Sequence, residues 1–151
     1  YHDSIGVNSR LDSLQAAILK VKLKRLDTYN LARKNVAEKY NDAFSNIHQI
    51  ETPKTSSFSN HVYHQYTLKI NDLETRNSLI SFLNNNNIPS MIYYPIPNHL
   101  QLGYKNYGYK LGDLPITENL CERVLSLPIH TEMDENTQDY IISKILGFFD
   151  K

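Results

Sequence analysis

Two polar residues near the start of the chain, Asn8 and Arg10, stand just before a long apolar segment. A helix that begins after them would offer free backbone N–H groups and the positive end of its dipole to an anion. The guanidinium of Arg10 would add a planar cationic group that binds phosphate oxygens. The pair therefore predicts a site for a phosphate or a phosphorylated ligand, unless it forms only an asparagine turn and a surface ion pair.

A second polar cluster lies in the stretch YYPIPNHLQLGY, residues 93–104, where two prolines restrict the backbone. Its hydrogen-bonding side chains are Tyr93, Tyr94, His99, Gln101 and Tyr104. Loops that a rigid scaffold presents are where ligand contacts concentrate. The stretch therefore predicts either a ligand-binding loop or a packing loop whose tyrosine hydroxyls are hydrogen-bonded internally.

Other reactive residue types do not form recognisable sites. His61 and His64 are expected on opposite faces of a strand, and no H-x-x-x-H or C-x-x-C spacing occurs. The single cysteine, Cys121, lies beside Leu120 in a predicted helix, which favours a buried structural thiol. Glycine-rich phosphate loops and the G-x-S-x-G motif are also missing from the sequence. We therefore assign no metal ligand and no catalytic residue.

The composition excludes several classes of protein. The 151 residues are enough for one domain with a core, and the 16 basic and 16 acidic residues cancel. No overall charge therefore argues for nucleic acid or a membrane surface as partner. No apolar run reaches the roughly 20 residues that a membrane span needs. One cysteine without an internal partner fits a reducing compartment, so we expect a cytoplasmic protein.

The elements that position these residues begin with a helix. The apolar period predicts a single long helix over residues 11–44, and Ser9 is the expected N-cap because Ser9 and Asp12 fit the S-x-x-D pattern. The first half of this helix is apolar nearly all round, so we expect more than one neighbour to cover it. Such a helix suits a connector between two bodies.

The remaining patterns predict a small domain of the α/β (α+β) class. We expect helices at 73–83, capped by Asn71 or Asp72, at 117–124, and after a cap at Asp134. Strands are expected at 61–70, 88–95 and 125–129. The resulting order, one long helix followed by β-α-β-α-β-α, predicts a small α/β sandwich of about three strands with helices on one face.

The stretch HDSIGVNSRLDSLQAAILKVKLKRLDTYNLARKNVAEKY, residues 2–40, resembles a known family segment, G-x-N-x-R-[LM]-D-x-x-Q-A-A-x-L-x-x-K-L. The segment is that of the DegT/DnrJ/EryC1/StrS family, the sugar-nucleotide aminotransferases. Later stretches match the C-terminal portion of this family in the same order: HVYHQYTLKI, IYYPIPNHLQLGY, GDLPITENLCERVLSLPIH and a final amphipathic helix. The resemblance covers essentially the whole chain.

The resemblance implies the C-terminal part of an enzyme with the aspartate aminotransferase fold (fold type I). Residues 1–50 would be the connecting segment and long interdomain helix, and residues 51–151 the C-terminal small domain. Family enzymes hold pyridoxal 5′-phosphate on a lysine and transfer an amino group, usually from glutamate, to a nucleotide-linked keto-deoxysugar. That lysine belongs to a large domain that would precede Tyr1, which is not an initiator methionine. We therefore expect this chain alone to be inactive.

The resemblance also implies roles for four residues. Asn8 matches an asparagine that reaches the cofactor phosphate of the neighbouring subunit, and Arg10 matches the arginine near the same phosphate or those of the substrate. Tyr94 and His99 fall in the Y-P-x-P-x-H stretch, which lies near the sugar-nucleotide site. These contacts imply a homodimer with shared active sites.

Two other functions stay open on the sequence. A stand-alone small-molecule-binding or regulatory module would need a fold that hides the apolar helix face internally. A dimerisation element would bind no nucleotide sugar.

Overall fold

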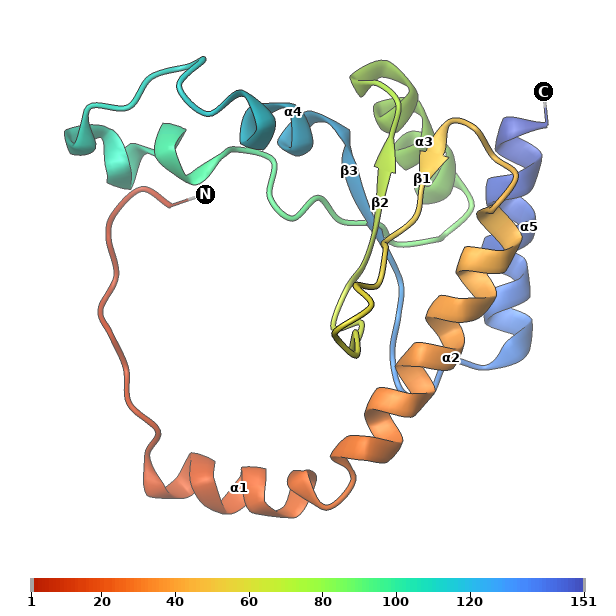
Figure 1. Cartoon of the computed structure of the whole chain (residues 1–151), viewed down its shortest axis with the longest axis horizontal. Helices are drawn as coiled ribbons and strands as arrows, with labels where there is room; N and C mark the ends of the chain where they lie inside the picture. The colour runs from red at the N-terminus through yellow and green to blue at the C-terminus, as the bar shows by residue number, and fades with distance from the viewer. Residues whose placement is uncertain (1, 151) are drawn as a thin grey trace.

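A three-stranded antiparallel sheet, in the order β1-β2-β3, organises the body of the molecule (Figure 1). The computed structural model describes residues 2–150. The strands are β1 (Ile50–Glu51), β2 (Tyr66–Ile70) and β3 (Val124–Leu127). Ile50 lies opposite Ile70, and Leu68 lies opposite Leu125. The strand count that the sequence predicts is therefore confirmed, although one of the three strands is a different segment.

Helices make up most of the regular structure of the described residues. The α-helices are α1 (Ser13–Leu23), α2 (Leu26–Phe44), α3 (Leu73–Asn85), α4 (Pro115–Arg123) and α5 (Glu135–Phe149), and the 3₁₀ helices are η1 (Asn98–Leu100) and η2 (Leu102–Tyr107). In Figure 1, α2, α3 and α5 lie beside the sheet, whereas α1 lies well away from it. This mixture of helices with a small sheet confirms the predicted α/β (α+β) class.

The core lies between one face of the sheet and helices α2, α3 and α5. In β2, the side chains of Tyr66, Leu68 and Ile70 are fully buried, while the alternate residues are only partly so. The helices contribute Tyr40, Phe44, Leu79, Leu83, Ile141 and Ile145 to the same cluster. Alternation along a strand directs every second side chain to one face, so the sheet packs helices against that face.

Two buried tyrosines stand at the centre of this core. The ring centroids of Tyr40 and Tyr66 are 4.9 Å apart, and Phe44 stacks on Tyr40 at 5.7 Å. The Tyr40 hydroxyl donates to the Pro128 carbonyl at 3.1 Å, and the Tyr66 hydroxyl donates to Asn41 Oδ1 at 2.8 Å. Burial raises the pKa of both phenols, so both stay neutral and act as hydrogen-bond donors.

The single long helix predicted over residues 11–44 is wrong in its continuity, because the structure breaks it into α1 and α2. Arg25 has φ -111° and ψ 3°, outside the helical region, and its N–H bonds to the carbonyl of Lys22 at 2.9 Å. The direction of α2 is set by burying Val36 and Tyr40 in the core. No residue of α1 is buried, so nothing in the described chain holds α1 in line with α2.

The predicted N-cap of the first helix is also corrected. Asp12 caps α1, because its carboxylate accepts the N–H of Gln15 at 2.7 Å. An ionised carboxylate is a stronger acceptor than a hydroxyl at the positive end of a helix. The hydroxyl of Ser9 contacts only the carbonyl of Arg10, at 3.5 Å. Of the two caps that the sequence left open for the helix at 73–83, Asn71 and Asp72, the structure has Asp72. The cap predicted at Asp134 is confirmed. Each aspartate accepts the N–H of the residue three positions later.

Two strand predictions need correction. Only the second half of 61–70 is a strand, because Tyr63 has a positive φ of 46° that interrupts extended backbone. Residues 88–95 form no strand: Met91 alone pairs with Ser126, and the prolines at 89 and 95 have no N–H to donate. The third strand is instead β1, two residues that the sequence analysis did not identify.

The apolar surface of α1 is exposed in this structure. Leu14 is 74% exposed, Val21 70% and Ile18 53%. The neighbours that the sequence analysis expected around this helix are therefore not supplied by residues 2–150.

We expect this chain to self-associate through α1 as its concentration rises, because contiguous apolar surface tends to be covered. Replacing Ile18 and Val21 by glutamate should reduce this association, and sedimentation velocity over a concentration series would measure it. The control is Ile116→Glu, at a residue that is 78% exposed and remote from α1 in sequence. A strictly monomeric chain with a fully ordered α1 would contradict the expectation.

We expect Asp134→Ala to lower the urea midpoint of unfolding, because the N–H and hydroxyl of Thr137 lose their acceptor at 2.9 and 2.6 Å. These bonds hold the pKa of Asp134 below its usual value. A lowered folded pKa stabilises the fold above the unfolded pKa of about 3.9, and this stabilisation is lost as pH falls through the folded pKa.

Asp134→Asn is the matched control for this cap. It keeps a capping oxygen at neutral pH but removes the titrating group, so its stability should lack that acid dependence. Equal pH dependence in both proteins would contradict the role of the charge.

Candidate functional site

A pocket of about 310 Å³ separates the proline-rich loop at 93–98 from helix α4. Its lining residues are Tyr93, Tyr94, Ile96, Pro97, Asn98, Thr117, Leu120, Cys121 and Val124. Most of these side chains are apolar or aromatic, and a few hydroxyl and amide groups stand among them. Such a lining suits a ligand that has both a flat apolar part and hydrogen-bonding groups. We call it the loop–α4 pocket.

Tyr94 is placed where a ligand could reach it. Its side chain is 57% exposed and lines the loop–α4 pocket. The His2 ring lies 6.3 Å from the Tyr94 ring, centroid to centroid. The structure thus brings the start of the chain next to the loop that the sequence analysis singled out.

His99 does not line this pocket. Its side chain is buried, and its Nε2 lies 2.9 Å from Glu118 Oε1. Glu118 also accepts the backbone N–H of Gly112 at 3.0 Å and of Leu114 at 3.2 Å. The pair therefore ties η1 to the start of α4 and to the turn before it, which fixes two walls of the loop–α4 pocket.

The environment of Glu118 favours its ionised form. Partial removal from water raises its pKa, but the N–H of Gly112, the His99 ring and the N–H of Leu114 together outweigh that effect. The net pKa lies below the usual value for glutamate. The sequence analysis did not identify Glu118, since no local pattern connects it to a histidine 19 residues away.

Asn8 and Arg10 lie in an irregular segment that leads from His2 to α1. Both are exposed, and within residues 2–150 neither side chain makes a hydrogen bond or an ion pair. Asp12 occupies an N–H of the first turn of α1, so the end of the helix is not an open anion site. The free amide and guanidinium still fit a phosphate, and these side chains would hold it without help from the helix end.

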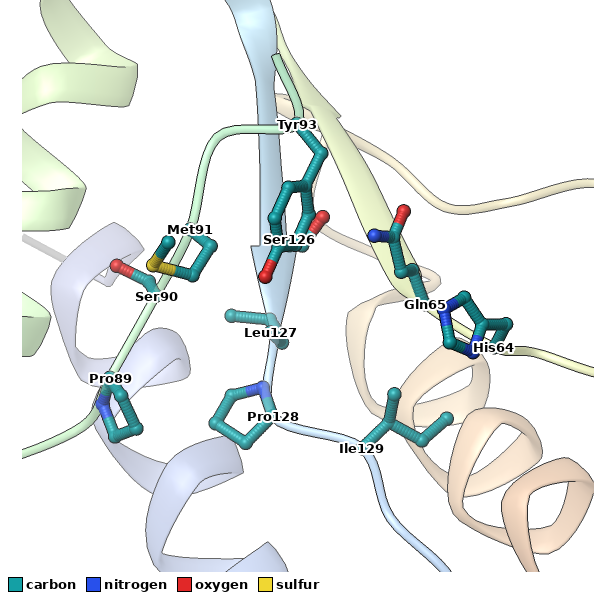
Figure 2. Close-up of a pocket in the computed structure, with 10 residues that line it drawn as sticks. All are labelled: His64, Gln65, Pro89, Ser90, Met91, Tyr93, Ser126, Leu127, Pro128 and Ile129. Carbon is teal, nitrogen blue, oxygen red and sulfur yellow. The ribbon is translucent and has the colours of Figure 1, made fainter. Parts of the chain in front are cut away.

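A second pocket, of about 230 Å³, lies against strand β3 (Figure 2). Pro89, Ser90 and Met91 flank β3 on one side, and His64 and Gln65 lie on the other. Tyr93 lines this pocket as well as the loop–α4 pocket. Ser126 lies in its wall, where its hydroxyl shares a hydrogen bond with that of Thr67 at 2.8 Å. The sequence analysis did not identify this pocket, because it depends on pairing between distant segments.

The lysine side chains of residues 2–150 lie away from these two pockets. No lysine among the described residues lines either one. Lys39 pairs with Asp139 and Lys69 with Glu51 on the surface. Cys121 is partly buried in the wall of the loop–α4 pocket, and burial raises the pKa of its thiol, which keeps the thiol neutral.

Neither a metal-binding cluster nor a membrane-spanning helix occurs among the described residues. No group of three or more histidine, cysteine, aspartate or glutamate side chains in 2–150 is arranged to hold a metal ion. Within the same range, no helix combines the length and apolarity that crossing a membrane requires.

We expect Glu118→Ala to loosen the turn at 112–114, because three donors lose their shared acceptor. Amide hydrogen exchange of Gly112 and Leu114 should be faster than in the parent chain. The lowered pKa of Glu118 means that these contacts stabilise the fold above the unfolded pKa of about 4.3. After correction for the intrinsic pH dependence of exchange, the protection of both amides should therefore fall as pH falls through the folded pKa.

Two variants control this measurement. Glu118→Gln keeps an acceptor oxygen and should show a smaller change at neutral pH. Glu122→Ala alters an exposed carboxylate of the same helix and should leave both amides unchanged. Equal acceleration in Glu118→Ala and Glu122→Ala would show that the turn depends on α4 as a whole.

Comparison with known proteins identifies relatives that match nearly the whole chain. The model of the DegT/DnrJ/EryC1/StrS aminotransferase family matches residues 1–146. A pleiotropic regulatory protein of Geobacillus stearothermophilus is 40% identical over 99% of this chain and 40% of its own length. The dTDP-3-amino-3,4,6-trideoxy-alpha-D-glucose transaminase of Micromonospora megalomicea is 35% identical over 93% of this chain and 38% of its own length.

A solved structure shares the fold. The crystal structure of Streptomyces venezuelae DesV in complex with a ketimine intermediate superposes with a TM-score of 0.87 and 31% identity. It is matched over 100% of this chain and 40% of that one. The chain thus spans about 40% of the length of the relatives that it matches. The sequence motifs, the fold and these matches agree, and the chain belongs to the DegT/DnrJ/EryC1/StrS aminotransferase family.

Proposed function

We propose that the chain is the C-terminal part of a pyridoxal phosphate-dependent aminotransferase that transfers an amino group, usually from glutamate, to a nucleotide-linked keto-deoxysugar. The observation that carries this proposal is the family match over residues 1–146. Two relatives support it. The Micromonospora megalomicea protein is named a transaminase of a dTDP-linked amino sugar, and the DesV structure contains a ketimine intermediate. The short span relative to these proteins supports a part rather than the whole.

In this proposal the chain supplies binding groups, and the missing part supplies the reacting lysine. Asn8 and Arg10 bind the cofactor phosphate in the partner subunit of a homodimer. Their exposure and the lack of a side-chain hydrogen bond or ion pair within 2–150 leave both groups available for this role. Bound pyridoxal phosphate would act as the electron sink of the reaction. Tyr94 contacts the nucleotide sugar at the loop–α4 pocket. His99 serves the same site indirectly, by holding Glu118 and the wall that follows it.

We expect Asn8→Ala to weaken cofactor binding by at least about tenfold in the complete enzyme, since a hydrogen bond to a charged group is worth about 1.5–3 kcal/mol. Equilibrium titration of the cofactor-free protein with pyridoxal phosphate would measure the change. Asn35→Ala is the matched control, because Asn35 is exposed on α2 and makes no side-chain hydrogen bond. Unchanged affinity in Asn8→Ala would remove the phosphate role.

A separate experiment tests whether the lysine that binds the cofactor lies outside this chain. This chain alone, mixed with pyridoxal phosphate, should show no transaminase activity and no borohydride-reducible adduct. The complete enzyme should form such an adduct on one lysine outside this chain and should aminate a nucleotide-linked keto sugar with glutamate as donor. Peptide mapping that located the adduct on a single lysine of this chain would overturn the proposal.

A regulatory module is the second candidate, and one observation favours it. The Geobacillus stearothermophilus relative is called a pleiotropic regulatory protein. The same adduct experiment separates the candidates, because a purely regulatory protein needs no lysine-bound cofactor. A complete protein that binds a nucleotide sugar without forming any reducible adduct would favour regulation.

A further inference from the structure

The first residues of the described chain return to the polar loop through Gln101. His2 donates its backbone N–H to Gln101 Oε1 at 2.8 Å. The carbonyl of His2 accepts the N–H of Gly103 at 2.9 Å. His2 is therefore held through both of its backbone polar groups. Figure 1 shows the first described residues next to the chain that forms the 3₁₀ helices, while the following segment runs away toward α1.

Both ends of the Gln101 side-chain amide are used. The side chain is only 4% exposed, and its Nε2 donates to the carbonyl of Ile96 at 3.0 Å. Ile96 lines the loop–α4 pocket beside Tyr94. A buried amide that lost either partner would keep its desolvation cost without a compensating hydrogen bond. The two bonds together therefore fix the orientation of the Gln101 amide. Gln101 thus connects the loop that carries Tyr94 to the start of the chain.

The backbones also approach closely at Gly103. A Cβ atom built there would lie 3.1 Å from the His2 carbonyl oxygen and 3.1 Å from the Ser4 carbonyl carbon. Such distances are tighter than ordinary van der Waals contact, so a larger side chain would push residues 2–4 away. The absence of a side chain at Gly103 is therefore part of the contact.

We propose that Gln101 is a positioning residue: its buried amide ties residues 2–4 to the 96–103 loop and so holds the segment that carries Asn8 and Arg10. At its other end the segment runs into α1, none of whose residues is buried in the described chain. The side chains of the segment are exposed. Fixing one end of an exposed segment reduces the number of conformations that a ligand would have to order. This use of the anchor rests on the phosphate role proposed above for Asn8 and Arg10.

The test combines amide hydrogen exchange with backbone NMR relaxation on this chain without cofactor. Gln101→Ala should accelerate exchange of the Gly103 amide by about tenfold, the effect of losing roughly one hydrogen bond's stabilisation. It should also lower the backbone order parameters of residues 3–10, whose exposed N–H groups make no hydrogen bond and therefore cannot report through exchange. Gly103→Val should do the same by a steric route. The two substitutions disturb the contact in different ways, so the same result from both would not come from an unrelated defect of one variant.

Each variant has a matched control. Gln138 is equally buried, 4% exposed, and donates to the carbonyl of Val36 at 2.8 Å, so Gln138→Ala should destabilise the core and leave 2–12 unchanged. Gly147→Val adds a side chain where a Cβ meets nothing within 4 Å. Unchanged order parameters of residues 3–10 in Gln101→Ala would overturn the proposal. An equal fall in Gln138→Ala would overturn it too, because the effect would then be global.

The complete enzyme provides the second readout. Gln101→Ala should raise the dissociation constant of pyridoxal phosphate by the factor by which the ordered fraction of 2–12 falls, and Gln138→Ala should not. Unchanged affinity despite disordering of 2–12 would overturn the positioning role. If Asn8→Ala also left affinity unchanged, the phosphate role itself would fail. The two failures are therefore distinguishable.

Discussion

Burial of one sheet face against α2, α3 and α5 is the constraint on which the rest of this structure depends. Tyr66, Leu68 and Ile70 reach full burial only because each helix presents an apolar side to them. Tyr40 then has to satisfy its hydroxyl inside the core, and it does so on the carbonyl of Pro128, just after β3. That bond ties α2 to the segment that leads from β3 toward α5. The sheet edge beside β3, and the pocket against it, follow from this arrangement.

Beyond the core, polar side chains that are buried or partly buried fix the irregular segments of the chain. Glu118 and Gln101 both accept backbone N–H groups of irregular segments, where no helix or strand ladder would satisfy them. Because buried polar groups are costly when unpaired, these contacts select one loop conformation out of many. The polar loop at 93–104 is therefore shaped by a few side chains rather than by regular structure. Its proposed ligand contacts, at Tyr94 above all, depend on them.

The N-terminal part of the chain has the opposite character. Helix α1 has no buried residue, and its apolar side chains face outward. The amphipathic pattern of α2, by contrast, is matched by the core that it covers. A helix with an uncovered apolar surface is stable chiefly when something packs on it. The chain spans about 40% of the length of its relatives, and we propose that the remainder covers this surface in the complete enzyme.

Local chemistry was readable from the sequence alone. The cap at Asp134 follows from a side chain and an N–H three residues apart, and the same rule narrows the cap of α3 to Asn71 or Asp72. The buried positions of β2 follow from strict alternation. The family follows from motifs in fixed order. The tertiary structure alone decided the break at Arg25, the strand β1, and the contacts of His99 with Glu118 and of Gln101 with His2. These contacts join residues that are 19 and 99 positions apart, and such pairings exist only once the core has brought their segments together.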